Sequence, residues 1–126
     1  MVNQLRKNNR LTGLTGEKAA VEYLENVGYE ILETNYRYGR LGEIDIIARE
    51  NEYLCFVEVK TRNNLLFGLP SEAVDWKKQN KIRQMALLYT KMHKLENGKI
   101  RFDVVEVLLD KAGKPTVNLI RNAFGG

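Results

Sequence analysis

The sequence has little of what marks secreted or membrane proteins. A single cysteine, Cys55, cannot form an internal disulfide and offers no thiolate cluster for zinc. No apolar run approaches the roughly 20 residues that span a bilayer. The opening segment MVNQLRKNNRLTG is basic but lacks the apolar core of a secretory signal. We therefore expect a cytoplasmic protein without membrane association.

Histidine is equally scarce, which narrows the chemistry of any site. His93 is the only one, so a histidine-based metal or catalytic site is excluded. The 20 basic and 16 acidic residues leave a net charge of +4, which permits a nucleic-acid partner without requiring one. A length of 126 residues and a hydrophobic content of 44% fit one globular domain with one core.

Hydrophobic periodicity predicts the element order α-β-β-β-α-β-β, an α/β fold with a mixed β-sheet. Gly28 closes the first helix and Asp75 caps the second. Short links between the first three strands favour an antiparallel meander. A flexible basic arm is expected over residues 1–11 and a single domain over residues 12–126. The expected helices cover residues 15–27 and 75–94, and the expected strands cover 30–37, 42–49, 53–61, 100–109 and 116–121.

Three charged residues interrupt the most apolar strands. Alternation places Glu58 and Lys60 on one face of their strand, and it places Asp45 opposite Ile44 and Ile46 on the preceding strand. If the two strands pair through the short Glu-Asn-Glu link between them, Asp45 lies near Glu58 and Lys60. Two carboxylates and a lysine would then converge on an otherwise apolar surface.

Such a cluster suits metal-dependent phosphodiester hydrolysis. Neighbouring carboxylates repel unless a cation or a proton intervenes. A hard Mg²⁺ ion prefers oxygen ligands, and a nearby lysine can orient a water or stabilise developing charge. The ordinary alternative is a solvated strand face with a surface ion pair worth about 0–1 kcal/mol.

Glu17 is a further unusual acid. It lies at the edge of the apolar stripe of the first helix, which contains Ala20, Val21 and Leu24. A carboxylate at the edge of a core-facing stripe needs a partner. Glu17 therefore joins Asp45 and Glu58 as a candidate site residue.

The segment GEIDIIA, followed nine residues later by EVK, resembles the PD-(D/E)XK nuclease signature. The Gly-Glu-Ile-Asp form is similar to that of archaeal Holliday-junction resolvases. Over residues 12–109, from GLTGEKAAVEYL through FVEVKTR to RFDVVEV, the chain resembles the YraN-like family of small uncharacterised bacterial proteins. One departure is that Ile44 stands where the motif name has proline.

The resemblance implies a restriction-endonuclease-like core, in which helices flank a mixed central β-sheet, and a site that binds Mg²⁺ or Mn²⁺. Asp45 and Glu58 match the metal-binding acids, with the Val59 carbonyl as an extra ligand. Lys60 matches the motif lysine, and Glu17 matches a helix glutamate that completes the site directly or through water. The implied activity is endonucleolytic hydrolysis of DNA, with branched and flapped DNA among the candidate substrates. The alternatives are a nuclease-fold module that binds nucleic acid or protein without cutting, and a metal-free structural protein.

Basic residues near the expected site are candidates for contacting phosphates. A solvated helix face is the equal alternative for those on the second helix. Trp76 can pack on the nearby loop or stack on a base, and packing is the more ordinary outcome. The basic candidates are Arg37, Arg40, Arg62, Lys77, Lys78, Lys81 and Arg83.

Assembly is suggested by the apolar loop NNLLFGLP, which begins at Asn63. If Leu65, Leu66, Phe67 and Leu69 are exposed, they provide a contact for a homodimer, the commonest oligomer. The alternative is that the loop folds back onto its own sheet.

Overall fold

The computed structural model describes residues 15–62, 74–95 and 98–125 of the chain. Their elements follow the predicted order α-β-β-β-α-β-β, and each strand end lies within one residue of its predicted position. The predicted arm (residues 1–11) and the proposed dimer loop (63–70) lie outside the described residues. The N-terminal helix covers residues 15–26, and the other elements are β1 (Glu30–Tyr38), β2 (Gly42–Glu50), β3 (Tyr53–Arg62), α3 (Trp76–Met92), β4 (Lys99–Leu109) and β5 (Pro115–Ile120).

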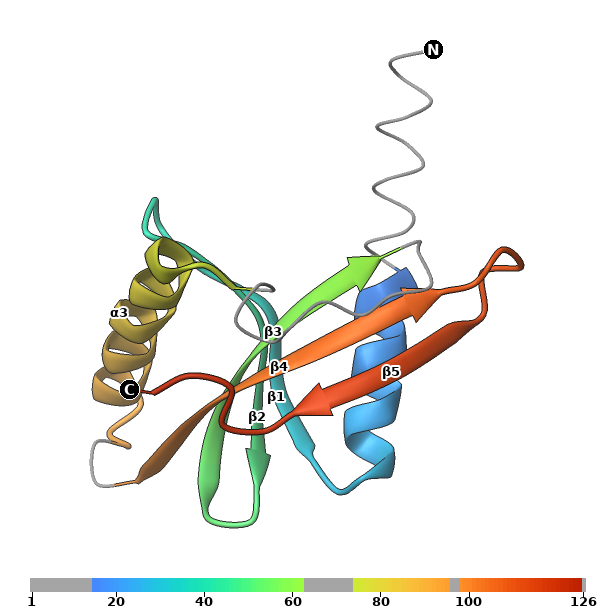
Figure 1. Ribbon diagram of the computed structural model, residues 1–126. Coiled ribbons are helices and arrows are strands. Elements are labelled where there is room, and N and C mark those ends of the chain that lie inside the picture. Colours follow the sequence, from blue (N-terminus) through green and yellow to red (C-terminus); the bar gives the residue numbers. More distant parts are fainter. Residues whose placement is uncertain (1–14, 63–73, 96–97, 126) are drawn as a thin grey trace.

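The strands form a five-stranded mixed sheet in the order β1-β2-β3-β4-β5 (Figure 1). The antiparallel meander predicted for β1 to β3 is confirmed. Strands β3 and β4 are parallel and are connected through α3, as a parallel pair requires a long crossover. Strand β5 returns antiparallel to β4. This architecture is consistent with the restriction-endonuclease-like core that the resemblance implies.

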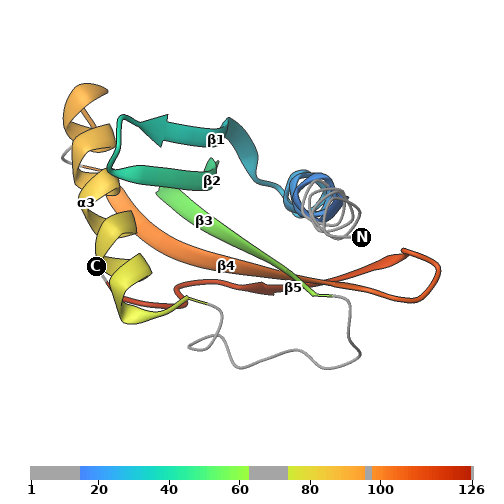
Figure 2. The ribbon, with the colours of Figure 1, turned by 90° about the horizontal axis from the view of Figure 1, so that it is seen from above.

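A helix covers each face of the sheet (Figure 2). On one face, Met85 of α3 packs in a buried cluster with Phe56 of β3. On the other face, Leu24 of the N-terminal helix packs in a second cluster with Val57 of β3. The side chains of adjacent residues of β3 therefore point to opposite faces of the sheet, as expected for a strand. Within the described residues, no helix is both long and apolar enough to cross a membrane.

Strand β2 departs from the expected alternation near its start. Ile44 and Ile46 are predicted to share a face, but Ile44 packs beneath α3 and Ile46 packs beneath the N-terminal helix. The pairing of β2 with β3 extends only as far as Ile46 and Val57. On the other side of β2, Asn35 lies opposite Asp45 and has a left-handed φ of 51°. The strand therefore twists at Asp45, which a regular period of two cannot predict.

Helix α3 begins and ends close to its predicted limits. Asp75 is its N-cap, and its carboxylate accepts a 2.8 Å hydrogen bond from the backbone N–H of Lys78. The apolar spacing of this helix predicts one buried stripe, formed by Ile82, Met85, Ala86, Tyr89 and Met92. Met92 is instead exposed, whereas Thr90 is buried. Met92 is the last residue of the helix.

A network of charged side chains ties β2, β4 and β5 together. We call Tyr29, Glu50, Arg101, Asp103 and Arg121 the arginine cluster. Arg101 pairs with Glu50 at 2.6 Å and with Asp103 at 2.9 Å, and Arg121 pairs with Glu50 at 2.7 Å. The Tyr29 hydroxyl donates to Asp103 at 2.7 Å. Four of the five side chains come from different elements or links, so the network fixes this end of the sheet.

Candidate active site

The candidate site lies where β2 and β3 separate. The backbone hydrogen bonds between the two strands stop at Ile46 and Val57. Beyond this pair, the side chain of Asp45 accepts a hydrogen bond from the backbone of β3. One carboxylate oxygen of Asp45 accepts a 2.8 Å hydrogen bond from the backbone N–H of Val59. This bond fixes the Asp45 carboxylate in the gap between the strands, next to the position of Glu58.

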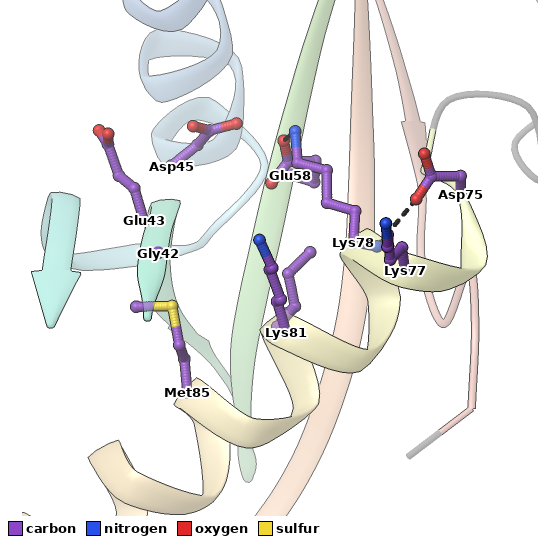
Figure 3. A pocket seen from close by; sticks show the side chains of 10 residues that line it. Gly42, Glu43, Asp45, Glu58, Asp75, Lys77, Lys78, Lys81 and Met85 are labelled. Carbon is purple, nitrogen blue, oxygen red and sulfur yellow. Dashed lines mark hydrogen bonds and ion pairs between the residues drawn. The ribbon is translucent and has the colours of Figure 1, made fainter. Parts of the chain in front are cut away.

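Glu58 supplies the second carboxylate of the site. Its side chain is only 4% exposed and lies on the face of β3 that α3 covers. Oε1 of Glu58 forms an ion pair with Nζ of Lys78, which reaches down from the first turn of α3 (Figure 3). Oε2 of Glu58 is buried and has no hydrogen-bond partner in the described part of the chain. Half of this carboxylate is therefore left with unmet hydrogen-bonding capacity.

The electrostatics of Asp45 reflect a shortage of positive charge. Burial, then the charge of Glu58, and also a hydrogen bond between the Asp45 and Glu58 carboxyl groups raise the pKa of Asp45 to about 7, against the opposing effects of the Val59 N–H and Lys78. Burial favours the neutral form of Lys78, but Glu58 outweighs it and raises the pKa of that ammonium. One lysine is thus insufficient for two carboxylates, and an additional cation or proton is favoured.

Glu17 approaches the same place from the N-terminal helix. It is half-buried and lines a second pocket together with Asp45 and Asn35. Burial raises the pKa of Glu17, a hydrogen bond from Asn35 opposes the change, and the charges of Asp45 and Glu43 add to it. Asp45 thus lines one pocket together with Glu58 and a second pocket together with Glu17.

The helix can approach β3 because residue 16 is a glycine. A Cβ atom at Gly16 would lie 1.8 Å from the hydroxyl oxygen of Thr61. No side chain fits there without displacing the helix or the strand. This close approach places the neighbouring Glu17 beside the separating strands.

Lys60 is placed differently from the other motif residues. It is exposed on β3, and it is absent from the linings of the two pockets that contain Asp45. In the parallel register it lies opposite Glu106 of β4. The ammonium nearest to Glu58 among the described lysines is that of Lys78, which the sequence predicts only as a phosphate-binding residue.

A pocket of about 450 Å³ opens above Asp45 and Glu58. Its floor holds the two carboxylates, and its rim on α3 carries Lys77, Lys78 and Lys81 (Figure 3). The pocket is large enough for a phosphodiester group with its waters. Three of the seven predicted phosphate-contacting residues therefore surround the candidate site.

The other four basic candidates are not among the residues that line this pocket. Arg37 forms an exposed ion pair with Glu43 at 3.0 Å. Arg40 is exposed in the turn between β1 and β2. Arg62 is half-buried at the end of β3, and Arg83 lies over the Trp76 ring.

The donor set suits a hard cation, although it is not a preassembled metal cage. Across residues 15–62, 74–95 and 98–125, no three His, Cys, Asp or Glu side chains are grouped closely enough to hold a metal ion. Oxygen donors are nevertheless adjacent at Asp45 and Glu58, and one buried oxygen of Glu58 lacks a partner. Carboxylate oxygens with unmet charge are the ligands that Mg²⁺ and Mn²⁺ prefer.

Three residues near the site are not among the candidates that the sequence suggests. Asn35 has a left-handed backbone conformation, and its side chain contacts Glu17. The one feature of the sequence that could have indicated it is that asparagine tolerates this conformation. Glu43 lines the pocket, and it belongs to the quoted Gly-Glu-Ile-Asp segment. Glu106 is fully buried with no partner for either oxygen among the described residues. Its signal is an acid within the apolar run FDVVEVLL.

Comparison with known proteins places this arrangement in a family. A model of the Uncharacterised protein family UPF0102 matches residues 16–107, which include Glu17, Asp45, Glu58 and Lys60. A UPF0102 protein of Acetivibrio thermocellus is 51% identical over 123 residues, covering 94% of this chain and 95% of that protein. UPF0102 proteins of Caldicellulosiruptor bescii and Caldicellulosiruptor saccharolyticus are 50% and 48% identical, each over 93% of this chain and 99% of its own length. These matches confirm the resemblance to the YraN-like group.

Proposed function

The chain belongs to the uncharacterised protein family UPF0102, and we propose that it is a Mg²⁺- or Mn²⁺-dependent nuclease that hydrolyses phosphodiester bonds in DNA. The observation that carries this proposal is the pair of carboxylates, Asp45 and Glu58, held together beneath a rim of lysines. A buried carboxyl whose pKa is raised to about 7 costs stability when it is ionised, and such groups are concentrated at functional sites.

Asp45, Glu58, the Val59 carbonyl and Glu17 would hold the cation. The unpartnered buried oxygen of Glu58, within the described residues, supports this fit. When bound, a divalent cation polarises a phosphate oxygen and lowers the pKa of a water. The Val59 N–H keeps the Asp45 carboxylate oriented toward the pocket.

The lysines of α3 would position the substrate. Lys77 and Lys81 line the rim opposite the carboxylates, where their ammonium groups can hold phosphates on either side of the reacting one. The family resemblance assigns the role of the motif lysine to Lys60, whereas the ammonium that pairs with Glu58 is that of Lys78. Separate Lys60→Ala and Lys78→Ala variants decide which ammonium the reaction needs. Branched or flapped DNA is the substrate that the resolvase resemblance favours.

A second candidate function is binding of nucleic acid without cleavage. The ion pair between Lys78 and Glu58 favours it, because this contact already neutralises part of the carboxylate site. The lack of a close three-acid group among the described residues favours it as well. In this case the lysine rim binds phosphates, and the two acids serve only to orient Lys78.

The experiment is a cleavage assay over duplex, single-stranded, flap and four-way DNA, with Mg²⁺ and with Mn²⁺. We expect wild-type cleavage of at least one substrate and a loss of at least about 100-fold in Asp45→Asn. The matched control is Glu52→Gln, an isosteric change of an acid that is 62% exposed in the link between β2 and β3. Wild type and variant are purified in parallel. If Asp45→Asn still cleaves DNA, the assignment of Asp45 to the active site is contradicted. Binding without cleavage of any substrate would favour the second candidate.

A further inference from the structure

Trp76 is an exposed aromatic side chain beside the candidate site. It is the only tryptophan of the chain and the first residue of α3. Its side chain is 70% exposed, the largest exposed fraction among the large hydrophobic side chains of the described residues. Its chain neighbours Asp75 and Lys77 both line the pocket that contains Asp45 and Glu58. The packing that the sequence favours for Trp76 therefore leaves most of the indole open to solvent.

One side of the indole is supported by a fixed guanidinium. The central carbon of Arg83 lies 5.0 Å from the centre of the Trp76 ring, two helical turns along α3. Arg83 itself donates hydrogen bonds to the Gly125 carbonyl at 2.7 Å, to Asn80 at 2.9 Å and to Gln79 at 3.0 Å. The ring is thus held in an oriented position before any ligand arrives, which lowers the entropy cost of binding.

Positive charge is concentrated on α3 after Trp76, and the adjacent acid, Asp75, is engaged as the N-cap of the helix. The first turn of α3 contains no acidic residue, and it carries Lys77 and Lys78 next to the indole. Lys81 follows one turn later and also faces the pocket. Exposed aromatic rings combined with a basic track are the recurrent means of binding single strands, because each base offers a face for stacking and each phosphate a charge.

We propose that Trp76 stacks on an unpaired base, so that nucleic acid with a single-stranded or locally unpaired segment is the substrate class of this site. The inference rests on the proposed function, in that the strand stacked on Trp76 leads into the pocket of Asp45 and Glu58. Within a duplex, neighbouring base pairs cover both faces of each base, and a rigid side chain on a helix surface cannot reach them. A single strand, a flap or a junction branch point leaves a base face free.

The fluorescence of the single tryptophan tests this without any cleavage. Wild-type protein in EDTA is titrated with an oligothymidylate of about 15 nucleotides and, separately, with a blunt duplex of equal length. We expect an emission maximum typical of an exposed indole in the free protein. We also expect saturable quenching by the single strand, and little quenching by the duplex.

The matched variants are Trp76→Ala and Leu87→Ala, each of which truncates an exposed apolar side chain of α3. With a labelled oligothymidylate, anisotropy should show about 5- to 100-fold weaker binding for Trp76→Ala and unchanged binding for Leu87→Ala. Trp76→Phe should recover part of the affinity, because a smaller ring still stacks. Circular dichroism checks that each variant is folded.

The outcomes separate this inference from the proposed function. Absence of quenching by the single strand, or equal affinity of wild type and Trp76→Ala, would overturn the stacking role even if metal-dependent cleavage is found. A blue-shifted, buried indole in the free protein would overturn it as well. Quenching that depends on Trp76 would support it even if no DNA is cut, and the cleavage proposal alone would then fail.

Discussion

In the described part of the chain, the acids of the arginine cluster and the pair Asp45 and Glu58 are neutralised in opposite ways. In the arginine cluster, both oxygens of Asp103 and both of Glu50 accept hydrogen bonds from arginine or tyrosine side chains. At the candidate site, Asp45 and Glu58 share a single lysine, and one oxygen of Glu58 has no partner among the described residues. Every carboxylate oxygen of the first cluster thus has a donor, whereas in the second a single ammonium pairs with one of two neighbouring carboxylates.

The pKa values express the same difference. Hydrogen bonds from Arg121, and to a smaller extent from Arg101, lower the pKa of Glu50 to about 2 against the opposing effect of burial. Burial and the charge of Glu58 raise the pKa of Asp45 to about 7. A structural cluster stabilises its charged form in the absence of ligand, whereas a cluster that awaits a cation does not. We therefore assign stability to the arginine cluster and chemistry to the pair of acids.

The largest expected effect on stability comes from breaking the arginine cluster. Arg101→Met would leave the fully buried Asp103 without its main counter-charge and should lower the free energy of unfolding by about 3–5 kcal/mol. The control is Lys99→Met, which removes an exposed ion pair with Glu52 and should leave the free energy of unfolding nearly unchanged. Urea unfolding measures both. Equal losses would mean that the cluster has no special structural role.

The second prediction uses the opposite pKa shifts. Because the folded protein retains the Asp45 proton up to a pH of about 7, and the unfolded chain loses it near 3.8, stability should fall as pH rises between these values. Asp45→Asn removes this dependence and should be about 1–4 kcal/mol more stable than wild type at about pH 8, with little difference at about pH 4. Glu50 has the opposite effect on stability, because its pKa is lowered on folding. The stability that it contributes is complete above about pH 4.5 and is lost as pH falls to about 2. Urea unfolding across this pH range, in the absence of metal, is the measurement. Parallel pH profiles of wild type and Asp45→Asn would contradict the assigned shift.

The third prediction concerns how Glu17 reaches the site. Gly16→Ala forces a Cβ atom into the Thr61 side chain and should lower the free energy of unfolding by about 1–3 kcal/mol. Gly125→Ala is the matched control, since its Cβ would meet no atom within 4 Å. Thermal unfolding gives the comparison. The double variant Gly16→Ala with Thr61→Ala should recover part of the loss, and a failure to do so would place the strain elsewhere.

The smallest expected effect concerns the lysine rim. The double variant Lys77→Ala with Lys81→Ala should flatten the log–log dependence of DNA affinity on salt by about one unit for each phosphate that these lysines no longer neutralise. Lys99→Ala, a lysine change outside the rim, should leave the slope unchanged. Fluorescence anisotropy at several salt concentrations measures the slope. An unchanged slope in the double variant would move the binding surface away from the pocket.

The elements are predictable from the sequence because their signals are local. Alternation marks the ends of β1 to β5 within one residue, and the capping side chain of Asp75 marks the start of α3. The same alternation places Glu58 on the same face of β3 as Phe56, and in the structure α3 covers that face. These features depend on residues close together in the chain, for which propensity and period are informative.

The remainder of the site depends on contacts between distant residues. Lys78 lies 20 positions after Glu58, and nothing local distinguishes it from Lys77 as the partner of that acid. The twist that separates Ile44 from Ile46 arises where pairing with β3 stops, opposite Asn35 of β1. Periodicity assumes a regular strand and therefore fails where the strand is irregular, which is also where Asp45 lies.

Isothermal titration of the wild-type protein with Mn²⁺ and with Mg²⁺ tests the central claim most directly. We expect saturable binding that strengthens as pH rises through about 7, because the cation competes with the Asp45 proton. Asp45→Asn should abolish this binding, and Glu52→Gln, which alters an exposed acid, should leave it intact. Lys78→Met should strengthen it, since the competing ammonium is removed from Glu58. An absence of binding in the wild type, or equal binding by wild type and Asp45→Asn, would contradict the assignment of Asp45 and Glu58 as a metal site.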